Sequence, residues 1–416
     1  MFMTSTLPKK HRTTGLIKPV LWLAAFLFLG CSGFAQQRTP QFLEKVTQGA
    51  VLLADESGRV ILNHQEDQPF PPASTVKILT SEIAIQALGL DYQPNTEFYL
   101  GPQGQLGIKG FGDPYLISEE IALIAVRLKK LGLRRFSGIQ LDRSQFKTSA
   151  KAPGTTNTLN PYDALNGALA VNFNSLFLRR DQSGKVYSAE SVTPLTPLAQ
   201  TKGNQLKPGT ADRFNLTNKP GESILYVAQL FQKILNREGL PTGSDFRFAP
   251  LSSEFKLLFI HQNSRDLSTM LTGLLKYSNN YIANQLLFIL GAEVYGWPAE
   301  EAKSLKYLNQ QIIKQFNPDP EKFQLKEGSG ISRSNHMTAS MMLKVLTQFK
   351  PHYALLHRHR KIKAAYLKSG TLTGVYNYAG YFKTKKGLRP FVIFLSQKTN
   401  RRDELLRDLY LFSTSH

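Results

Sequence analysis

The alternation of apolar and polar residues predicts β-strands at both ends of the chain. Residues 50–54 and 60–62 are apolar and β-prone, and the Gly-containing turn between them predicts a hairpin. Residues 366–373 and 391–396 predict two further strands, and a last helix follows at about residues 403–412. If the strands of the two ends pair with each other, they form one mostly antiparallel sheet flanked by helices, which is an α+β fold.

A helical pattern begins at Ser74 and ends at Leu88, just before a glycine that serves as a stop signal. Val76, Leu79 and Ile83 lie on one face of this helix, and other apolar residues lie off that face. A helix that is apolar on most sides is buried. We therefore expect this helix in the core of the protein.

Further helical patterns occupy residues 223–237, 267–290 and 336–349. Between residues 92 and 217 the pattern changes to short strands separated by turns rich in Gly and Pro, with one clear amphipathic helix.

A chain of 416 residues is too long for one small core and suggests two domains. We predict a discontinuous main domain at residues 36–95 and 218–416, with an inserted domain at residues 96–217.

The first 35 residues have the pattern of an export signal. Four basic residues precede an apolar run at residues 20–30, which is too short to span a bilayer but suits a signal peptide. Gly33-Phe34-Ala35 has small residues at the alternate positions that a signal peptidase prefers, so we predict a signal peptide at residues 1–35. The alternative is lipidation of Cys31, because Gly30-Cys31 resembles the end of a lipobox. In both cases the expected location is the periplasm or its envelope.

The composition is that of a globular protein with a strong positive charge. The apolar fraction is 42%, and the net charge is +21. Without the predicted signal peptide the chain keeps 47 basic and 30 acidic residues, a net charge of +17. This charge favours peripheral association with an anionic envelope. Nucleic acid is a disfavoured partner, because no basic block is interleaved with aromatic residues. A single cysteine excludes an intrachain disulfide and a zinc site built on thiolates.

Three short motifs carry candidate chemistry. The first, Ser74-Thr75-Val76-Lys77, places a hydroxyl and an amine on one face of the predicted buried helix. A Ser hydroxyl needs a neighbouring base to act as a nucleophile. A Lys is a base only where burial or a nearby positive charge keeps it neutral. Alone the motif is weak, because Ser at a helix start is more often a cap.

The second motif is Ser278-Asn279-Asn280, in which a hydroxyl can relay a proton and an amide can hold a carbonyl group. The third is Lys368-Ser369-Gly370-Thr371 on a predicted strand, where the ammonium and hydroxyl can hold a carboxylate and Gly lets a ligand backbone approach. Singly these residues more often mark turns and caps. Together and in this order, S-x-x-K, S-x-N and K-[ST]-G are typical of β-lactamases and penicillin-binding proteins.

The chain resembles the class C low-molecular-mass penicillin-binding proteins, the D-alanyl-D-alanine carboxypeptidase/endopeptidases of the penicillin-binding protein 4 type. The resemblance covers nearly all of the chain after the signal peptide. Besides the three motifs, it rests on residues 72–80, 110–114, 138–146, 160–174 and 327–333. The chain departs from the family at Asn279 and Glu327, where Asp is usual, and at Ser369, where Thr is usual. None of these changes removes a catalytic group. The insert looks shorter than in the larger members.

The resemblance implies a serine β-lactamase/transpeptidase-like domain with an inserted smaller domain. It implies that Ser74 attacks the carbonyl between two D-alanines, that Lys77 accepts its proton, and that Ser278 relays a proton to the leaving amine. Water then releases the product. The implied reactions are removal of a terminal D-Ala and hydrolysis of D-alanyl cross-links in peptidoglycan.

The resemblance also implies how substrate is held. Asn280 would bind the amide of the acyl side, and Lys368 and Ser369 the terminal carboxylate, on the strand that contains Gly370. The backbone N–H groups of Ser74 and Thr371 would form the oxyanion hole. The implied partners are peptidoglycan stem peptides and β-lactams, which acylate Ser74. No metal or organic cofactor is implied.

Two rival interpretations stay open. A serine β-lactamase shares the three motifs but releases the acyl group quickly, whereas a penicillin-binding protein stays acylated. A non-catalytic peptidoglycan-binding protein of the same fold would not depend on Ser74.

Overall fold

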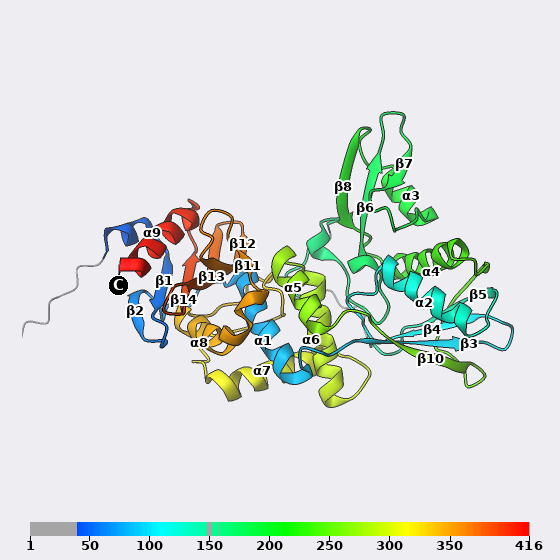
Figure 1. The fold of residues 1–416 in the computed structure, drawn as a ribbon, viewed down its shortest axis with the longest axis horizontal. Coiled ribbons are helices and arrows are strands. Elements are labelled where there is room, and N and C mark those ends of the chain that lie inside the picture. Colours follow the sequence, from blue (N-terminus) through cyan, green and yellow to red (C-terminus); the bar gives the residue numbers. More distant parts are fainter. Residues whose placement is uncertain (1–39, 148–151, 157, 416) are drawn as a thin grey trace, which may run out of the picture. The chain divides into compact units, whose positions relative to one another are not determined.

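The structure is a computed structural model that describes residues 40–147, 152–156 and 158–415 (Figure 1). The predicted signal peptide at residues 1–35, with Cys31, lies outside the described residues. Within the described part of the chain, no helix is both long and apolar enough to cross a membrane.

The two ends of the chain meet in a six-stranded antiparallel sheet, as the sequence predicts (Figure 1). Strands β1 and β14 are adjacent in its centre, with Leu52 opposite Val392. In spatial order the strands are β11 (His357–Arg358), β12 (Ala365–Leu372), β13 (Val375–Lys383), β14 (Leu388–Leu395), β1 (Gly49–Ala54) and β2 (Val60–His64).

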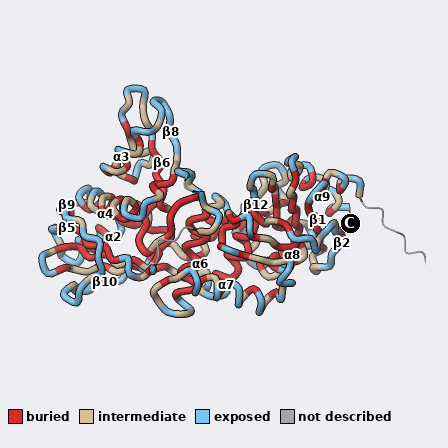
Figure 2. The backbone as a smooth tube through the Cα atoms, turned by 180° about the vertical axis from the view of Figure 1, so that it is seen from behind, coloured by how far each residue is buried: buried red, intermediate tan, exposed pale blue. Residues whose placement is uncertain are grey.

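Helices cover both faces of this sheet, because its central strands carry apolar residues on both sides. One face packs on a large helical core. Its helices are α1 (Lys77–Leu88), α5 (Leu267–Tyr277), α6 (Asn280–Tyr295), α7 (Glu301–Phe316) and α8 (Ala339–Phe349). The other face packs on the 3₁₀ helix η1 (Gln41–Lys45) and on α9 (Arg402–Ser415). Figure 2 shows the central strands and α6 as buried.

The prediction of one helix at residues 267–290 is wrong, because the structure has two. Ser278 adopts a left-handed conformation with φ of 56°, which ends α5. The side chain of Asn279 then accepts a hydrogen bond from the N–H of Ile282 and caps α6. The break places Ser278 and Asn280 at a junction between helices. Several elements, among them β13 and α7, have no counterpart among the predicted ones.

A second sheet of five strands combines parallel and antiparallel pairs, and has its own core. In spatial order its strands are β10 (Lys256–Gln262), β3 (Asn95–Leu100), β4 (Leu106–Gly110), β5 (Phe136–Asp142) and β9 (Thr242–Phe248). The helices α2 (Ser118–Lys130) and α4 (Pro220–Arg237) pack on it. A small third sheet has the order β7 (Val186–Ser188), β6 (Ser175–Arg180), β8 (Thr210–Asn215), with α3 (Pro197–Gly203) beside it.

The second sheet continues past the predicted end of the insert at Thr217, since α4, β9 and β10 all belong to its core. Its two chain ends also lie together, because the N–H of Asn263 donates to the carbonyl of Pro94 at 3.0 Å. The division into domains stays a prediction, and we propose that the insert spans residues 95–262 instead of 96–217.

Candidate active site

Ser74 lies on a 3₁₀ turn, η2 (Ala73–Val76), directly before α1. The preceding Ala73 has φ of 47°, a left-handed conformation that is uncommon for a residue with a side chain. Asn377 of β13 donates from its amide to the carbonyl of Pro71 at 2.8 Å, and the Thr75 hydroxyl donates to the carbonyl of Pro72 at 2.7 Å. These bonds hold the turn that presents the half-buried Ser74.

Two glycines let other segments approach the backbone at Ser74. A Cβ added at Gly370 of β12 would lie 2.8 Å from the carbonyl oxygen of Pro72 and 3.1 Å from the nitrogen of Ser74. A Cβ at Gly330, where φ is 84°, would lie 1.9 Å from the carbonyl oxygen of Ala73. We predicted that Gly370 lets a ligand approach the strand. In the structure it lets the strand itself approach the serine turn.

Lys77 is fully buried at the start of α1, and its Nζ has three oxygen neighbours. They are Oγ of Ser74 at 2.9 Å, Oδ1 of Asn280 at 2.8 Å and the carbonyl of Ser329 at 2.6 Å. The amide oxygen and the carbonyl can only accept hydrogen bonds. A neutral amine has two N–H groups and one lone pair, so these two acceptors take both N–H groups. The lone pair is left for the hydroxyl of Ser74.

Burial favours this neutral form. Desolvation, followed by the positive charge of Lys368, holds the pKa of Lys77 well below that of an ordinary lysine, while Glu327 acts in the opposite direction. Lys368 lies on β12 and is itself almost fully buried. Desolvation and then the charge of Arg402 lower its pKa to about 7. Its Nζ donates to the carbonyl of Ser369 at 2.6 Å.

A buried carboxylate organises the loop that supplies the Ser329 carbonyl. Glu327 accepts hydrogen bonds from the backbone N–H and the hydroxyl of Ser329 at 2.6 and 2.5 Å, and from the N–H of Gly330 at 2.8 Å. It also accepts from Ser332 and Asn335. Glu327 thus fixes the position of the Ser329 carbonyl, which orients Lys77. None of these hydrogen bonds involves Ser74.

Two residues of the S-x-N motif are predicted site residues, Ser278 and Asn280, and only Asn280 is hydrogen-bonded to Lys77. Asn280 accepts from Lys77, and its Nδ2 donates to the carbonyl of Tyr162 at 3.4 Å. Ser278 is half-buried at the junction of α5 and α6. Its hydroxyl makes no hydrogen bond with the other described residues.

Motif reasoning missed Arg402, the first residue of α9. Its guanidinium donates to Oγ1 of Thr371 at 2.7 Å and to the carbonyl of Gly370 at 3.3 Å, and it lies over the ring of Tyr378. One sequence signal could have revealed it. A cation at a helix N-terminus is electrostatically unfavourable, so two consecutive arginines there indicate a role outside the helix.

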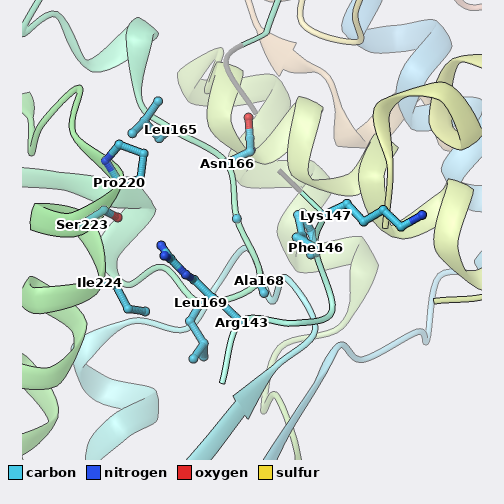
Figure 3. Close-up of a pocket in the computed structure, with 11 residues that line it drawn as sticks. Arg143, Phe146, Lys147, Leu165, Asn166, Ala168, Leu169, Pro220, Ser223 and Ile224 are labelled. Atoms are coloured by element: carbon cyan, nitrogen blue, oxygen red, sulfur yellow. The ribbon is translucent and has the colours of Figure 1, made fainter. Parts of the chain in front are cut away.

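The structure therefore joins Ser74, Lys77 and Asn280 by hydrogen bonds and brings Gly370 against the serine turn. A cavity of about 240 Å³ lies elsewhere, and none of the predicted site residues lines it (Figure 3). No cluster of three or more potential metal ligands occurs among the described residues.

Comparison with known proteins agrees with this geometry. Residues 35–365 match the D-Ala-D-Ala carboxypeptidase 3 (S13) family. The chain is 25% identical over 395 residues to a D-alanyl-D-alanine carboxypeptidase of Haemophilus influenzae, and the aligned region covers 78% of this chain and 80% of that relative. It is 23% identical over 351 residues to a D-alanyl-D-alanine carboxypeptidase of an Actinomadura species, which covers 74% of this chain and 65% of the relative.

Solved structures show the same fold. Penicillin binding protein 4 of H. influenzae superimposes with a TM-score of 0.70 at 20% identity, covering 87% of this chain and 94% of the other. A predatory endopeptidase of Bdellovibrio bacteriovorus gives 0.54 at 17% identity, covering 88% and 92%. These likenesses confirm the predicted α+β fold. Together with the family match, which spans most of the chain, they lead to one conclusion: the chain belongs to the D-Ala-D-Ala carboxypeptidase 3 (S13) family, whose members are serine-type carboxypeptidases.

Proposed function

We propose that the protein cleaves D-alanyl peptide bonds of peptidoglycan through an acyl-enzyme on Ser74, with Lys77 as the general base. The observation that carries this proposal is the hydrogen-bond pattern of the Lys77 amine. Two oxygen atoms that can only accept take its N–H groups, and the third neighbour, at 2.9 Å, is the Ser74 hydroxyl. A base in this position can remove the hydroxyl proton during attack.

Oγ of Ser74 attacks the carbonyl carbon between two D-alanines while its proton passes to Nζ of Lys77. As the C–N bond breaks, Ser278 gives its hydroxyl proton to the leaving amine, which departs as D-Ala, and the proton on Lys77 passes to Ser278, so Lys77 is neutral again. A water molecule next attacks the Ser74 ester while Lys77 takes a proton from it. Lys77 returns this proton to Oγ of Ser74 as the ester bond breaks, and the product leaves as a free acid.

Ser278 is proposed to relay the proton to the leaving amine. Its hydroxyl has no hydrogen bond to the other described residues, so it is available to donate to that amine. Asn280 holds Lys77 in the absence of substrate. We propose that its Nδ2, now on the carbonyl of Tyr162, turns to the acyl amide when substrate binds.

Lys368 and Ser369 on β12 are proposed to bind the terminal carboxylate of the substrate, and Arg402 to hold Thr371 for the same purpose. The proposed oxyanion hole consists of the N–H groups of Ser74 and Thr371. Its support is the close approach of β12 to the serine turn, which Gly370 permits. Such preorganised donors are usually the largest single term in acyl transfer.

We also propose that the enzyme works in the periplasm after removal of residues 1–35. Endopeptidase action on cross-links is proposed alongside carboxypeptidase action, because both break the same D-alanyl bond and differ only in the leaving amine.

The direct test is product analysis on purified muropeptides. Wild type should release free D-Ala from a pentapeptide and should separate D-alanyl cross-linked dimers into monomers, both followed by mass spectrometry. Ser74→Ala should do neither. Product formation by Ser74→Ala at the wild-type rate would refute the role of Ser74.

A further inference from the structure

A cavity of about 240 Å³ lies beside the α6 helix and is lined by three separate segments of the chain (Figure 3). The first follows β5 and contributes Arg143 and Phe146. The second is the loop of residues 165–169, and the third is the first turn of α4, with Pro220 and Ser223. This volume is below the roughly 300–1,000 Å³ of pockets for drug-sized ligands. It suits a ligand of the size of an amino acid or a dipeptide.

Arg143 is exposed to solvent, and it gives the cavity a positive charge that no described acidic side chain pairs with. Its guanidinium makes no hydrogen bond or ion pair with the described residues, and every acidic side chain of the protein lies among those residues. Figure 3 shows Arg143 directed toward Ser223 and Pro220, across the cavity. The neighbouring Lys147 points away from it and is paired with Glu300 at 2.7 Å.

The other lining residues determine which further chemical groups of a ligand fit the cavity. None of the lining residues is acidic, and most of their side chains are apolar, among them Phe146, Leu165, Leu169 and Ile224. The first turn of α4 forms part of this wall, so the positive end of its helix dipole lies beside the cavity. A carboxylate with a short aliphatic body complements these walls. A free ammonium group does not, since no carboxylate is present to pair with it.

Hydrogen bonds connect one wall of the cavity to α6, the helix that begins at the candidate active site. Asn166 donates to the carbonyl of Tyr281 at 2.9 Å and to Oε1 of Gln285 at 2.8 Å, and Gln285 donates back to the carbonyl of Gly167 at 2.8 Å. These bonds fasten the loop to α6, the helix that begins with Asn280. A few residues earlier, the same stretch of chain meets Asn280 at the carbonyl of Tyr162.

We propose that this cavity is a second binding site, for the C-terminal carboxylate of an N-acylated D-amino acid. Arg143 binds the carboxylate with its planar pair of N–H donors, and the apolar wall binds the aliphatic side chain. This inference rests on the proposed function, because the reaction leaves such an acyl-D-alanine terminus on each trimmed stem peptide. The site would keep the enzyme on peptidoglycan that it has already processed.

Trp297 offers a local readout, because its ring packs 6.4 Å from the ring of Phe146 in the cavity wall. The sequence has two tryptophans, so Trp22→Phe leaves Trp297 as the single fluorophore of the full chain. We would titrate this protein with N-acetyl-D-alanine, N-acetyl-D-alaninamide and D-alanine. The expected result is a saturable change in fluorescence with the first probe and binding that is roughly tenfold weaker or more with the other two.

Arg143→Ala should weaken the binding of N-acetyl-D-alanine by roughly tenfold or more. The matched control is Arg134→Ala, which removes an exposed arginine whose hydrogen bonds go only to backbone carbonyls, and which should change nothing. No saturable change, or equal binding by Arg143→Ala, would overturn the proposal. Binding that depends on Lys368 instead of Arg143 would also overturn it, since it would place the ligand at the serine site.

The same titration in Ser74→Ala separates this proposal from the proposed function. Binding to the cavity should persist there, because Ser74 does not line it. If wild type fails to cleave D-alanyl bonds but the Arg143-dependent binding remains, the proposed function fails and the cavity site stands. If cleavage is normal and the Arg143-dependent binding is absent, the cavity site fails alone.

Discussion

Two buried lysines, Lys77 and Lys368, set the electrostatics of the site. Desolvation lowers the pKa of each lysine, and the charge of Lys368 lowers the pKa of Lys77 further. The family resemblance implied that both lysines belong to one active site, Lys77 for proton transfer and Lys368 for binding the terminal carboxylate. It could not predict that Asn280 and the Ser329 carbonyl take both N–H groups of Lys77, because that requires three segments distant in the chain to meet.

The affinity for substrates with a free carboxylate should fall as the pH rises above about 7. Lys368 has a pKa of about 7, so its positive charge is present below that pH and lost above it. The value of kcat/KM for a D-Ala-D-Ala peptide should drop by about tenfold per pH unit once Lys368 is mainly neutral. Lys368→Arg keeps its charge at all these pH values, so a pH profile as steep as that of wild type in this variant would contradict the assignment.

Lys368→Met should inactivate the enzyme and stabilise the fold. A lysine whose pKa falls from 10.5 in the unfolded chain to about 7 in the folded one must lose its proton on folding between these values, which costs free energy. A buried Met carries no such cost, and Tm should rise by about 2 °C or more near pH 7. The gain should shrink as the pH approaches 10.5, where the unfolded lysine is neutral too. A lower Tm at pH 7 would show that Lys368 stabilises the fold.

Among the secondary-structure elements, the serine turn must lie in contact with β12 and with the loop that contains Gly330. Gly370 permits the first contact and Gly330 the second. The sequence located the hairpin at the N-terminus, the buried helix and the C-terminal strands to within a few residues. It missed β13 because this strand is buried on both faces and has no polar alternation. It merged α5 and α6 because apolar periodicity carries no sign of the left-handed Ser278.

Gly370→Ala should slow acylation and lower stability, because its Cβ would press on the backbone of Pro72 and Ser74. We expect a loss of at least about 1 kcal/mol in the free energy of unfolding, measured by chemical denaturation, and slower labelling by a fluorescent penicillin. Gly221→Ala is the matched control, since a Cβ there meets no atom within 4 Å. Equal labelling rates for both variants would argue against the close approach of β12.

Glu327→Gln should disorder the loop that supplies the Ser329 carbonyl. A Gln side chain replaces one acceptor oxygen by an NH₂ group, which faces donors that it cannot satisfy. The penicillin labelling rate should fall by roughly tenfold or more. Its pH profile should shift to lower pH, because the negative charge of Glu327 raises the pKa of Lys77 and the Gln side chain is neutral. Glu327→Asp keeps the carboxylate and should recover part of the rate. A lower rate with an unchanged pH profile would mean that Glu327 only supports folding.

In the whole molecule, the chain enters the five-stranded sheet at β3 and leaves it after β10. Sequence patterns predicted an insert here, and the insert stays a proposal. Its proposed later end depends on which strands pair, since β9 and β10 join β5 and β3 from far along the chain. Local propensity contains no information on such pairing. The core of the five-stranded sheet is a separate cluster from both cores of the six-stranded sheet.

The excess of basic residues should strengthen association with polymeric, anionic substrate and should leave the rate of the chemical step unchanged. The rate on intact, anionic peptidoglycan should fall as salt is raised, because exposed charges are screened beyond about 10 Å at 0.1 M ionic strength. The rate on a small soluble D-Ala-D-Ala peptide should change little over the same range. Both rates can be measured from released D-Ala, and an equal fall on the two substrates would assign the salt effect to the active site.

The proposed mechanism requires that a β-lactam forms a stable acyl-enzyme on Ser74. We would incubate wild type and Ser74→Ala with a fluorescent penicillin, follow the covalent label over time and locate it by peptide mass spectrometry. We expect durable label on the peptide that contains Ser74 in wild type and none in the variant. Label that is quickly lost would indicate a β-lactamase. Absence of label in wild type, or equal label in Ser74→Ala, would refute acylation of Ser74.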